Sequence, residues 1–212
     1  MPKRAMDDII NEIRENKKKV DAELSIIREE QDLSEAGRAK WAAKAWGKAM
    51  AKHRKLVAEL NATREETRTA LRKAAFSPRI GYTATVGDKA AIRQAFNTAM
   101  FSLQEADSKG LMRALERAQR TGDDLYALAV ANIAAEKGDS KVLQRYRELA
   151  GSERAEDMDK LVEFEKTFGD SRDTSTKFAE KIIISAPSQP KEISMYSEAW
   201  EIANAAMDGA EV

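Results

Sequence analysis

AGRAKWAAKAWGKAMAKHRKLVAELNATREETRTALRKAA, residues 36–75, contains no proline, and this stretch decides the fold. Its alanine, lysine, arginine and glutamate residues favour helix strongly, and glycine occurs only at Gly37 and Gly47. One helix of this length would span roughly 60 Å, more than a compact domain of this size allows. Ser77 precedes Pro78 and should end the helix. We therefore expect an extended helix that belongs to an arm.

A second helical pattern precedes this stretch. Its apolar residues recur at spacings of three or four, with one interruption at Lys17, which produces a single apolar stripe able to enter a coiled coil. We call the stripe the apolar seam; it comprises Ile10, Ile13, Val20, Leu24 and Ile27. The next helix of the same chain could cover this seam, or a second subunit could. We expect a subunit contact that buries the seam together with the region of Trp41 and Trp46.

The rest of the chain predicts shorter helices. Two Gly-Asp pairs, Gly122-Asp123 and Gly138-Asp139, lie sixteen residues apart. In each pair the glycine suits the left-handed residue that ends a helix, and the aspartate can cap the next helix. Residues 181–185, KIIIS, are the best strand candidate.

These patterns predict an all-α fold with at most one or two short strands. Residues 1–77 should form a helical hairpin or coiled-coil arm, and residues 78–87 a linker. Residues 88–212 should form a compact helical body that ends in an extended segment and a final helix.

Composition limits the function. The chain has 212 residues, and 36 basic side chains balance 36 acidic ones, so it is neither a wholly basic nucleic-acid coat nor an acidic mimic of DNA. It contains no cysteine, which excludes disulfides, thiolate zinc sites and cysteine nucleophiles. No signal peptide or membrane-spanning stretch is visible. We expect an intracellular protein, or one assembled in a cytoplasm, that does not insert into a membrane.

Catalytic and metal-binding patterns are weak. The single histidine, His53, has no serine or carboxylate three or four residues away on its helix. The carboxylates of residues 153–165 alternate with basic residues, as on a solvated helix face. We therefore predict no catalytic residue, no metal site and no cofactor, although a site assembled through space stays open as an alternative.

The strongest electrostatic feature is a basic stripe in the long helix. Between Arg38 and Lys55 there are seven basic residues and no acidic one. We call six of them the basic stripe: Arg38, Lys40, Lys44, Lys48, Lys52 and Lys55. Residues 1–75 carry 18 basic and 13 acidic side chains, a net charge of +5, and the remainder carries −5. The stripe could be a solvated face, could steer docking on an acidic protein surface, including that of another copy, or could neutralise nucleic-acid phosphates.

One stretch resembles a known group of proteins. LMRALERAQRTGDDLYALAVANIAAEKGDSKVLQRY, residues 111–146, is followed by Ile184-Ser185-Ala186-Pro187 and by Pro190. This arrangement is similar to helical proteins of unassigned role encoded among the structural genes of tailed phages and prophages of actinobacteria. In those proteins a charged helical N-terminal half ends in a break of phenylalanine plus proline, like Phe76 and Pro78 here.

The resemblance covers residues 34–190 and carries over no catalytic or ligand-binding residue. It implies a virion component or an assembly factor that acts near the capsid or tail. Our hypothesis is a non-enzymatic structural or assembly protein that forms a homo-oligomer, binds other phage structural proteins, or does both. The alternative is a regulatory or nucleic-acid-binding helical adaptor that uses the basic stripe.

Overall fold

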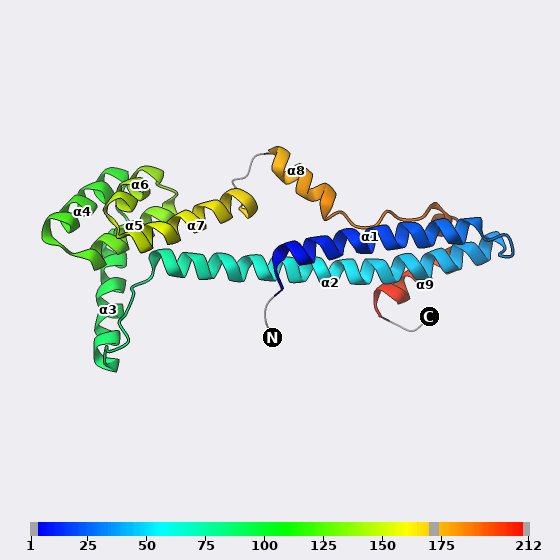
Figure 1. Ribbon diagram of the computed structural model, residues 1–212, viewed down its shortest axis with the longest axis horizontal. Coiled ribbons are helices and arrows are strands. Elements are labelled where there is room, and N and C mark those ends of the chain that lie inside the picture. Colours follow the sequence, from blue (N-terminus) through cyan, green and yellow to red (C-terminus); the bar gives the residue numbers. More distant parts are fainter. Residues whose placement is uncertain (1–3, 170–173, 210–212) are drawn as a thin grey trace. The chain divides into compact units, whose positions relative to one another are not determined.

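The structure is a computed structural model that describes residues 4–169 and 174–209, and this part of the chain is all-helical (Figure 1). The all-α prediction is confirmed. The elements are α1 Met6–Glu29, α2 Glu35–Phe76, α3 Val86–Leu103, α4 Ser108–Thr121, α5 Asp124–Lys137, α6 Ser140–Leu149, α7 Ser152–Phe168, α8 Thr174–Ile183, the 3₁₀ helix η1 Lys191–Met195 and α9 Ser197–Met207.

The prediction of a strand at residues 181–185 is wrong. Helix α8 continues through Ile183, and no strand occurs in the described ranges. Contacts outweigh the β-propensity of the isoleucines here. An ion pair joins Arg64 of α2 to Glu180 of α8, and Ile184 packs against a cluster of α1 and α2 residues.

The contacts divide the chain into two compact units. Unit 1 comprises Met1–Glu66 and Arg172–Val212, and unit 2 comprises Thr67–Ser171, so that α2 contributes residues to both. Residues 172–212, expected within a body of residues 88–212, group instead with the N-terminal helices. The reason is that the C-terminal helix packs on α2 through small side chains.

In unit 1, α1 and α2 pack side by side in opposite directions. Early α1 residues meet late α2 residues, and late α1 residues meet early α2 residues. The first cluster contains Ile9, Ile13, Leu56 and Leu60, and the second contains Val20, Leu24, Ile27, Ala42, Ala45 and Ala49. Between the clusters, the buried amide of Asn16 donates a hydrogen bond to the carbonyl oxygen of Ala49 at 2.9 Å.

The C-terminal segment lies against the same helices. Ile193 of η1 and the alanines Ala199 and Ala203 of α9 form a buried cluster with residues of α2. Two ion pairs fix the segment at its edges, Arg28 with Glu192 at 2.6 Å and Lys40 with Glu198 at 2.7 Å. The segment is therefore a structural part of unit 1.

In unit 2, α4, α5 and α6 follow one another through the two Gly-Asp pairs. Gly122 and Gly138 have φ values of +67° and +69°, and the carboxylates of Asp123 and Asp139 accept hydrogen bonds from the first turns of α5 and α6. This prediction is confirmed. The helices enclose a core that includes Leu111, Leu115, Leu128, Val130, Ile133, Val142 and Tyr146.

Side chains of α5 and α7 cap the C-terminal end of α2 within unit 2. Arg154 of α7 donates hydrogen bonds to the carbonyl oxygens of Ala75 at 2.8 Å and Ser77 at 3.2 Å. Asn132 of α5 donates to the carbonyl oxygen of Phe76 at 3.3 Å. Carbonyls at the end of a helix lack partners within the helix, so these side chains stabilise α2 at the residue where the proline pattern stops it.

Candidate interaction surfaces

The apolar seam is covered by its own chain. Ile13, Val20, Leu24 and Ile27 are buried between α1 and α2, and Ile10 is half-buried. The seam residues therefore come together, but the surface they would offer to a second subunit is occupied by α2.

The two tryptophans of the predicted contact lie in different environments. Trp46 is buried, its indole N–H donates to the carbonyl oxygen of Pro187 at 3.2 Å, and its ring centroid lies 6.3 Å from that of Trp200. Trp41 is 61% exposed. Only Trp41 is accessible to a partner.

Half of the basic stripe is engaged within unit 1. Lys40 pairs with Glu198, and Lys52 pairs with Glu12 at 2.6 Å. Hydrogen bonds from Lys52 and Arg4 hold the pKa of Glu12 below its ordinary value. Arg38 donates to the carbonyl oxygen of Glu30 at 3.0 Å. The remaining members, Lys44, Lys48 and Lys55, form no ion pair with the described residues.

His53 lies in a buried polar site of unit 1. The side chain is only 8% exposed, its Nδ1 atom has no hydrogen-bond partner, and burial, followed by the nearby charge of Lys17, lowers its pKa. Lys17 donates to Ser185 Oγ at 3.0 Å, and Ser185 in turn donates to the carbonyl oxygen of Ile182 at 2.8 Å. Because this carbonyl holds the hydroxyl hydrogen and Lys17 is a donor, Ser185 is not arranged as an activated nucleophile.

The carboxylates of residues 153–165 mostly pair with arginines. Arg79 bridges Glu153 and Asp157, and Arg147 binds Asp159 through two hydrogen bonds of 2.7 and 2.6 Å. Glu165 accepts a hydrogen bond from Arg68 at 3.0 Å. Among the described residues no group of three acidic or histidine side chains is placed to hold a metal ion.

A groove of about 920 Å³ lies within unit 2. Residues from the end of α2 and from α5, α6 and α7 line it, with apolar side chains such as Phe76, Leu143 and Val162 beside charged ones. The Arg147–Asp159 pair stands at this groove. The lining mixes apolar side chains with charged ones of both signs, two pairs of which, Arg147–Asp159 and Arg72–Glu165, are paired with each other, so it indicates no particular ligand.

The outer face of α3 carries no charge, although 34% of all residues in the chain are charged. Its members are all exposed: Val86, Gly87, Ala90, Ala91, Gln94, Ala95, Asn97, Thr98, Phe101 and Ser102. We call this set the α3 face. Val86 is 85% exposed and Phe101 is 78% exposed, and Leu103 is the one fully buried residue of the helix.

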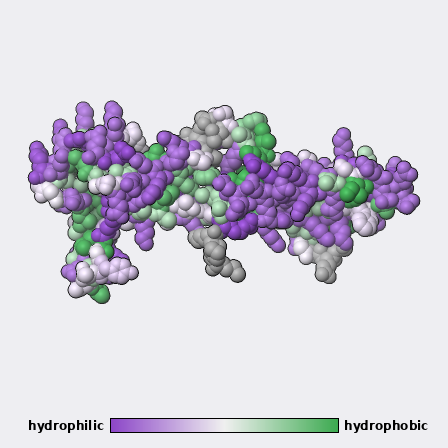
Figure 2. Space-filling model, in the orientation of Figure 1, coloured by the Kyte–Doolittle hydropathy of each residue, from purple (hydrophilic) through white to green (hydrophobic). Residues whose placement is uncertain are grey.

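The figures show the isolation of the α3 face. Within unit 2 the first half of α3 has no other helix beside it (Figure 1), and its surface is pale to green where that of α4 is purple (Figure 2). A shallow hollow of about 540 Å³ on this helix is lined by Ala91, Gln94, Ala95, Thr98, Ala99, Ser102 and Tyr126. The signal in the sequence is the low charge of this helix, which has only three charged side chains in eighteen residues.

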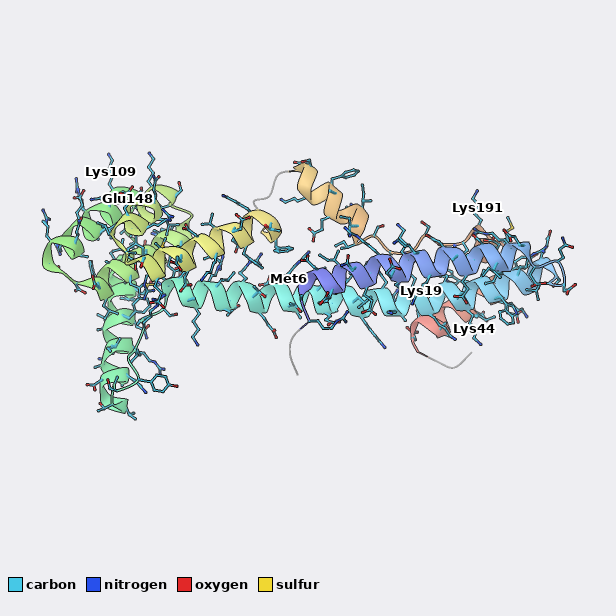
Figure 3. The ribbon with its side chains drawn as sticks, viewed as in Figure 1. Met6, Lys19, Lys44, Lys109, Glu148 and Lys191 are labelled. Atoms are coloured by element: carbon cyan, nitrogen blue, oxygen red, sulfur yellow. The ribbon has the colours of Figure 1, made fainter. Side chains whose placement is uncertain are left out.

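A second face that the sequence analysis missed lies on α4. Four exposed cations follow one side of this helix, and the start of the row is visible in Figure 3, where Lys109 projects outward. We call it the cation row; it comprises Lys109, Arg113, Arg117 and Arg120. Their spacing of four, four and three residues could have revealed the row.

Comparison with known proteins assigns none of these surfaces. No protein-family model, no curated protein and no solved structure matches the chain. In the described part, none of the helices combines the length and the apolar character needed to cross a membrane. The surfaces are therefore interpreted from their own chemistry.

Proposed function

We propose that this chain is a non-enzymatic structural or assembly protein that associates with a second copy through the α3 face. The α3 face carries this proposal, because ten exposed and uncharged positions on one side of a helix are typical of a helix packing surface. Burying a large apolar side chain contributes about 1.5–3 kcal/mol. Val86 and Phe101 would each gain such a contribution in a dimer.

The face is complementary to itself in one orientation. Phe101 is a large knob near the end of α3, and Gly87, Ala90, Ala91 and Gln94 form a diamond of mostly small residues near the start. Residues at these spacings form the hole that receives a knob from a facing helix. Antiparallel pairing of two copies places each Phe101 in the hole of the other, as a two-fold interface requires.

In this proposal, residues 1–77 serve as a preformed helical arm rather than as the oligomer interface. The apolar seam is already filled by α2 and the C-terminal segment is bound to the same helices. Substituting Ile13 and Val20 with aspartate would therefore disrupt the interior of unit 1 and would not test oligomerisation cleanly.

A place in a tailed-phage particle, as a capsid- or tail-associated component or as an assembly factor in the host cytoplasm, is supported by the resemblance of residues 111–146. Other phage structural proteins are then the further partners. Mass spectrometry of purified particles tests this part. Detection of the chain at a fixed copy number supports a virion component, whereas detection only in infected-cell lysate favours a transient assembly factor.

The alternative, a nucleic-acid-binding adaptor that uses the basic stripe, is favoured by one observation. Trp41 is exposed on the same side of α2 as Lys44, Lys48 and Lys55, and an aromatic ring beside free lysines suits nucleic acid. It predicts binding that weakens with salt and is lost when Lys44 and Lys48 become glutamine. Lys52 is left unchanged in this test because it pairs with Glu12.

The proposed self-association is tested by light scattering after size exclusion at several protein concentrations and at low and high salt. We expect a dimer mass in both salts because the α3 face is uncharged, and a monomer mass for Phe101→Asp. The matched control is Phe178→Asp, which makes the same change at an exposed phenylalanine of α8. A monomer mass for the unaltered protein at every concentration contradicts the proposal.

A further inference from the structure

The cation row of α4 is positioned by the core of unit 2. Leu111, Leu115 and Ala118 are buried, and they point the opposite side of α4 to solvent. Positions 109, 113, 117 and 120 lie on that side, because residues three or four apart share a helix face. The row is thus held rigidly by a packed helix, with all four cations directed outward.

These cations are not neutralised by ion pairs with the described residues of the chain. None of the four forms an ion pair with a described residue, in contrast to Lys40 and Lys52 of the basic stripe. Glu116 is the single acidic residue among them on α4. The row is therefore a local positive surface on a chain whose net charge is zero.

The neighbouring helix α6 extends the positive surface. Helices α4 and α6 pack against each other, and Ser108 at the start of α4 lies near Asp139, the N-cap of α6, where it lowers the pKa of that carboxyl. Lys141 is exposed in the first turn of α6 and makes no ion pair with the described residues. The acid Glu148, which lies on the same side of unit 2 as Lys109 in Figure 3, is paired with Arg145 at 2.8 Å.

We infer that the cation row binds the phosphodiester backbone of double-stranded DNA. At 1.5 Å per residue, the row from Lys109 to Arg120 spans about 16 Å. One strand of duplex DNA presents a phosphate about every 3.4 Å along its axis, so the row can follow about five phosphates. Three of the four cations are arginines, whose planar guanidinium groups bind phosphate oxygens in pairs.

The surroundings of the row favour a phosphate backbone over a protein partner. Protein interfaces depend on apolar anchors that become buried at their centre. The described chain exposes ten large apolar side chains strongly, but none of them lies on α4 or α6. The row offers positive charges without an exposed large apolar side chain beside them. Sequence-independent binding to DNA requires such charges and no apolar anchor.

The test is fluorescence anisotropy of a labelled 25-base-pair duplex with the full chain over about 20–200 mM salt, a range in which phosphate contacts weaken strongly. We expect the logarithm of the association constant to fall with a slope of about −3 to −4, because each phosphate contact contributes about −0.9. Arg113→Gln with Arg117→Gln should reduce the slope by about 2 and weaken binding at least roughly tenfold at the lowest salt. Glu116→Gln should strengthen binding.

The matched control is Lys44→Gln with Lys48→Gln, which removes the same charge from α2 and should leave the affinity unchanged. Circular dichroism confirms that each variant is folded. The inference is overturned if the duplex does not bind at low salt, or if the α2 variant loses as much affinity as the α4 variant. It is also overturned if labelled polyglutamate binds to the same row more tightly than the duplex, since the partner would then be an acidic protein.

Discussion

A Cβ atom on Gly47 of α2 would lie 2.6 Å from the carbonyl oxygen of Ala203 and 2.8 Å from the Cβ atom of Ala206 in α9. The main chain of α9 therefore packs directly against α2 at Gly47, a residue that has no side chain. This contact explains why the C-terminal helix belongs to unit 1.

Gly47→Ala should destabilise unit 1. The added methyl group meets a backbone oxygen that cannot rotate away, and overpacking of this kind costs about 1–3 kcal/mol, offset by up to about 1 kcal/mol from the better helix propensity of alanine. Urea unfolding followed by tryptophan fluorescence measures the change, because Trp46 and Trp200 meet at the same contact. Gly37→Ala is the control, since its added methyl meets only side chains. Equal stability of the two variants would contradict the close contact.

The buried His53 should make unit 1 less stable in mild acid. Its pKa is lowered in the folded chain from an ordinary value of 6.5, so below pH 6.5 the unfolded chain binds a proton that the folded chain resists. The free energy of unfolding should fall as the pH drops from 7 towards the folded pKa. His53→Leu should remove that part of the decline in urea titrations at pH 7, 6.5, 6 and 5.5. Parallel pH profiles for the two proteins would show that His53 titrates normally.

Asp139 should stabilise the start of α6 as an N-cap. Its carboxylate accepts a hydrogen bond from the Val142 N–H at 3.2 Å, and a hydrogen bond from Ser108 is the main cause of its lowered pKa. Asp139→Ala should cost about 1 kcal/mol, whereas Asp139→Asn, which can still cap, should cost less. The contribution of the charged form is complete above pH 3.8 and is lost as the pH falls through the lower folded value. Thermal unfolding at pH 7 ranks the variants, and an alanine variant as stable as the unaltered protein would rule out the cap.

The helices of this fold could be predicted because their signals are local. Alanine-rich stretches, proline at residue 78 and the Gly-Asp pairs each act within a few residues, and the structure contains the expected long helix and the caps at Asp123 and Asp139. The prediction of a strand at residues 181–185 failed because β-propensity, although it is also a local signal, is readily outweighed by packing.

The surfaces could be predicted less well, because the exposure of a side chain depends on contacts between elements that are distant in the sequence. The periodicity identified Ile13 and Val20 as buried residues, but it could not tell whether α2 or a second subunit covers them. Lys40 and Lys52 were recognised as cations, whereas their partners Glu198 and Glu12 come from distant or separate elements. The α3 face was missed because a set of alanines resembles a core until the structure shows that it is exposed.

The most direct test of self-association through α3 is disulfide formation by Ala95→Cys, because the natural chain contains no cysteine. Antiparallel packing of Phe101 over Gly87, Ala90, Ala91 and Gln94 places the two-fold axis close to residue 95, so these residues of the two copies lie at the same level. Under mild oxidation we predict a covalent dimer for Ala95→Cys and little for Gln119→Cys, which is exposed on α4. Equal yields from the two variants, or no dimer from Ala95→Cys, would contradict pairing through the α3 face.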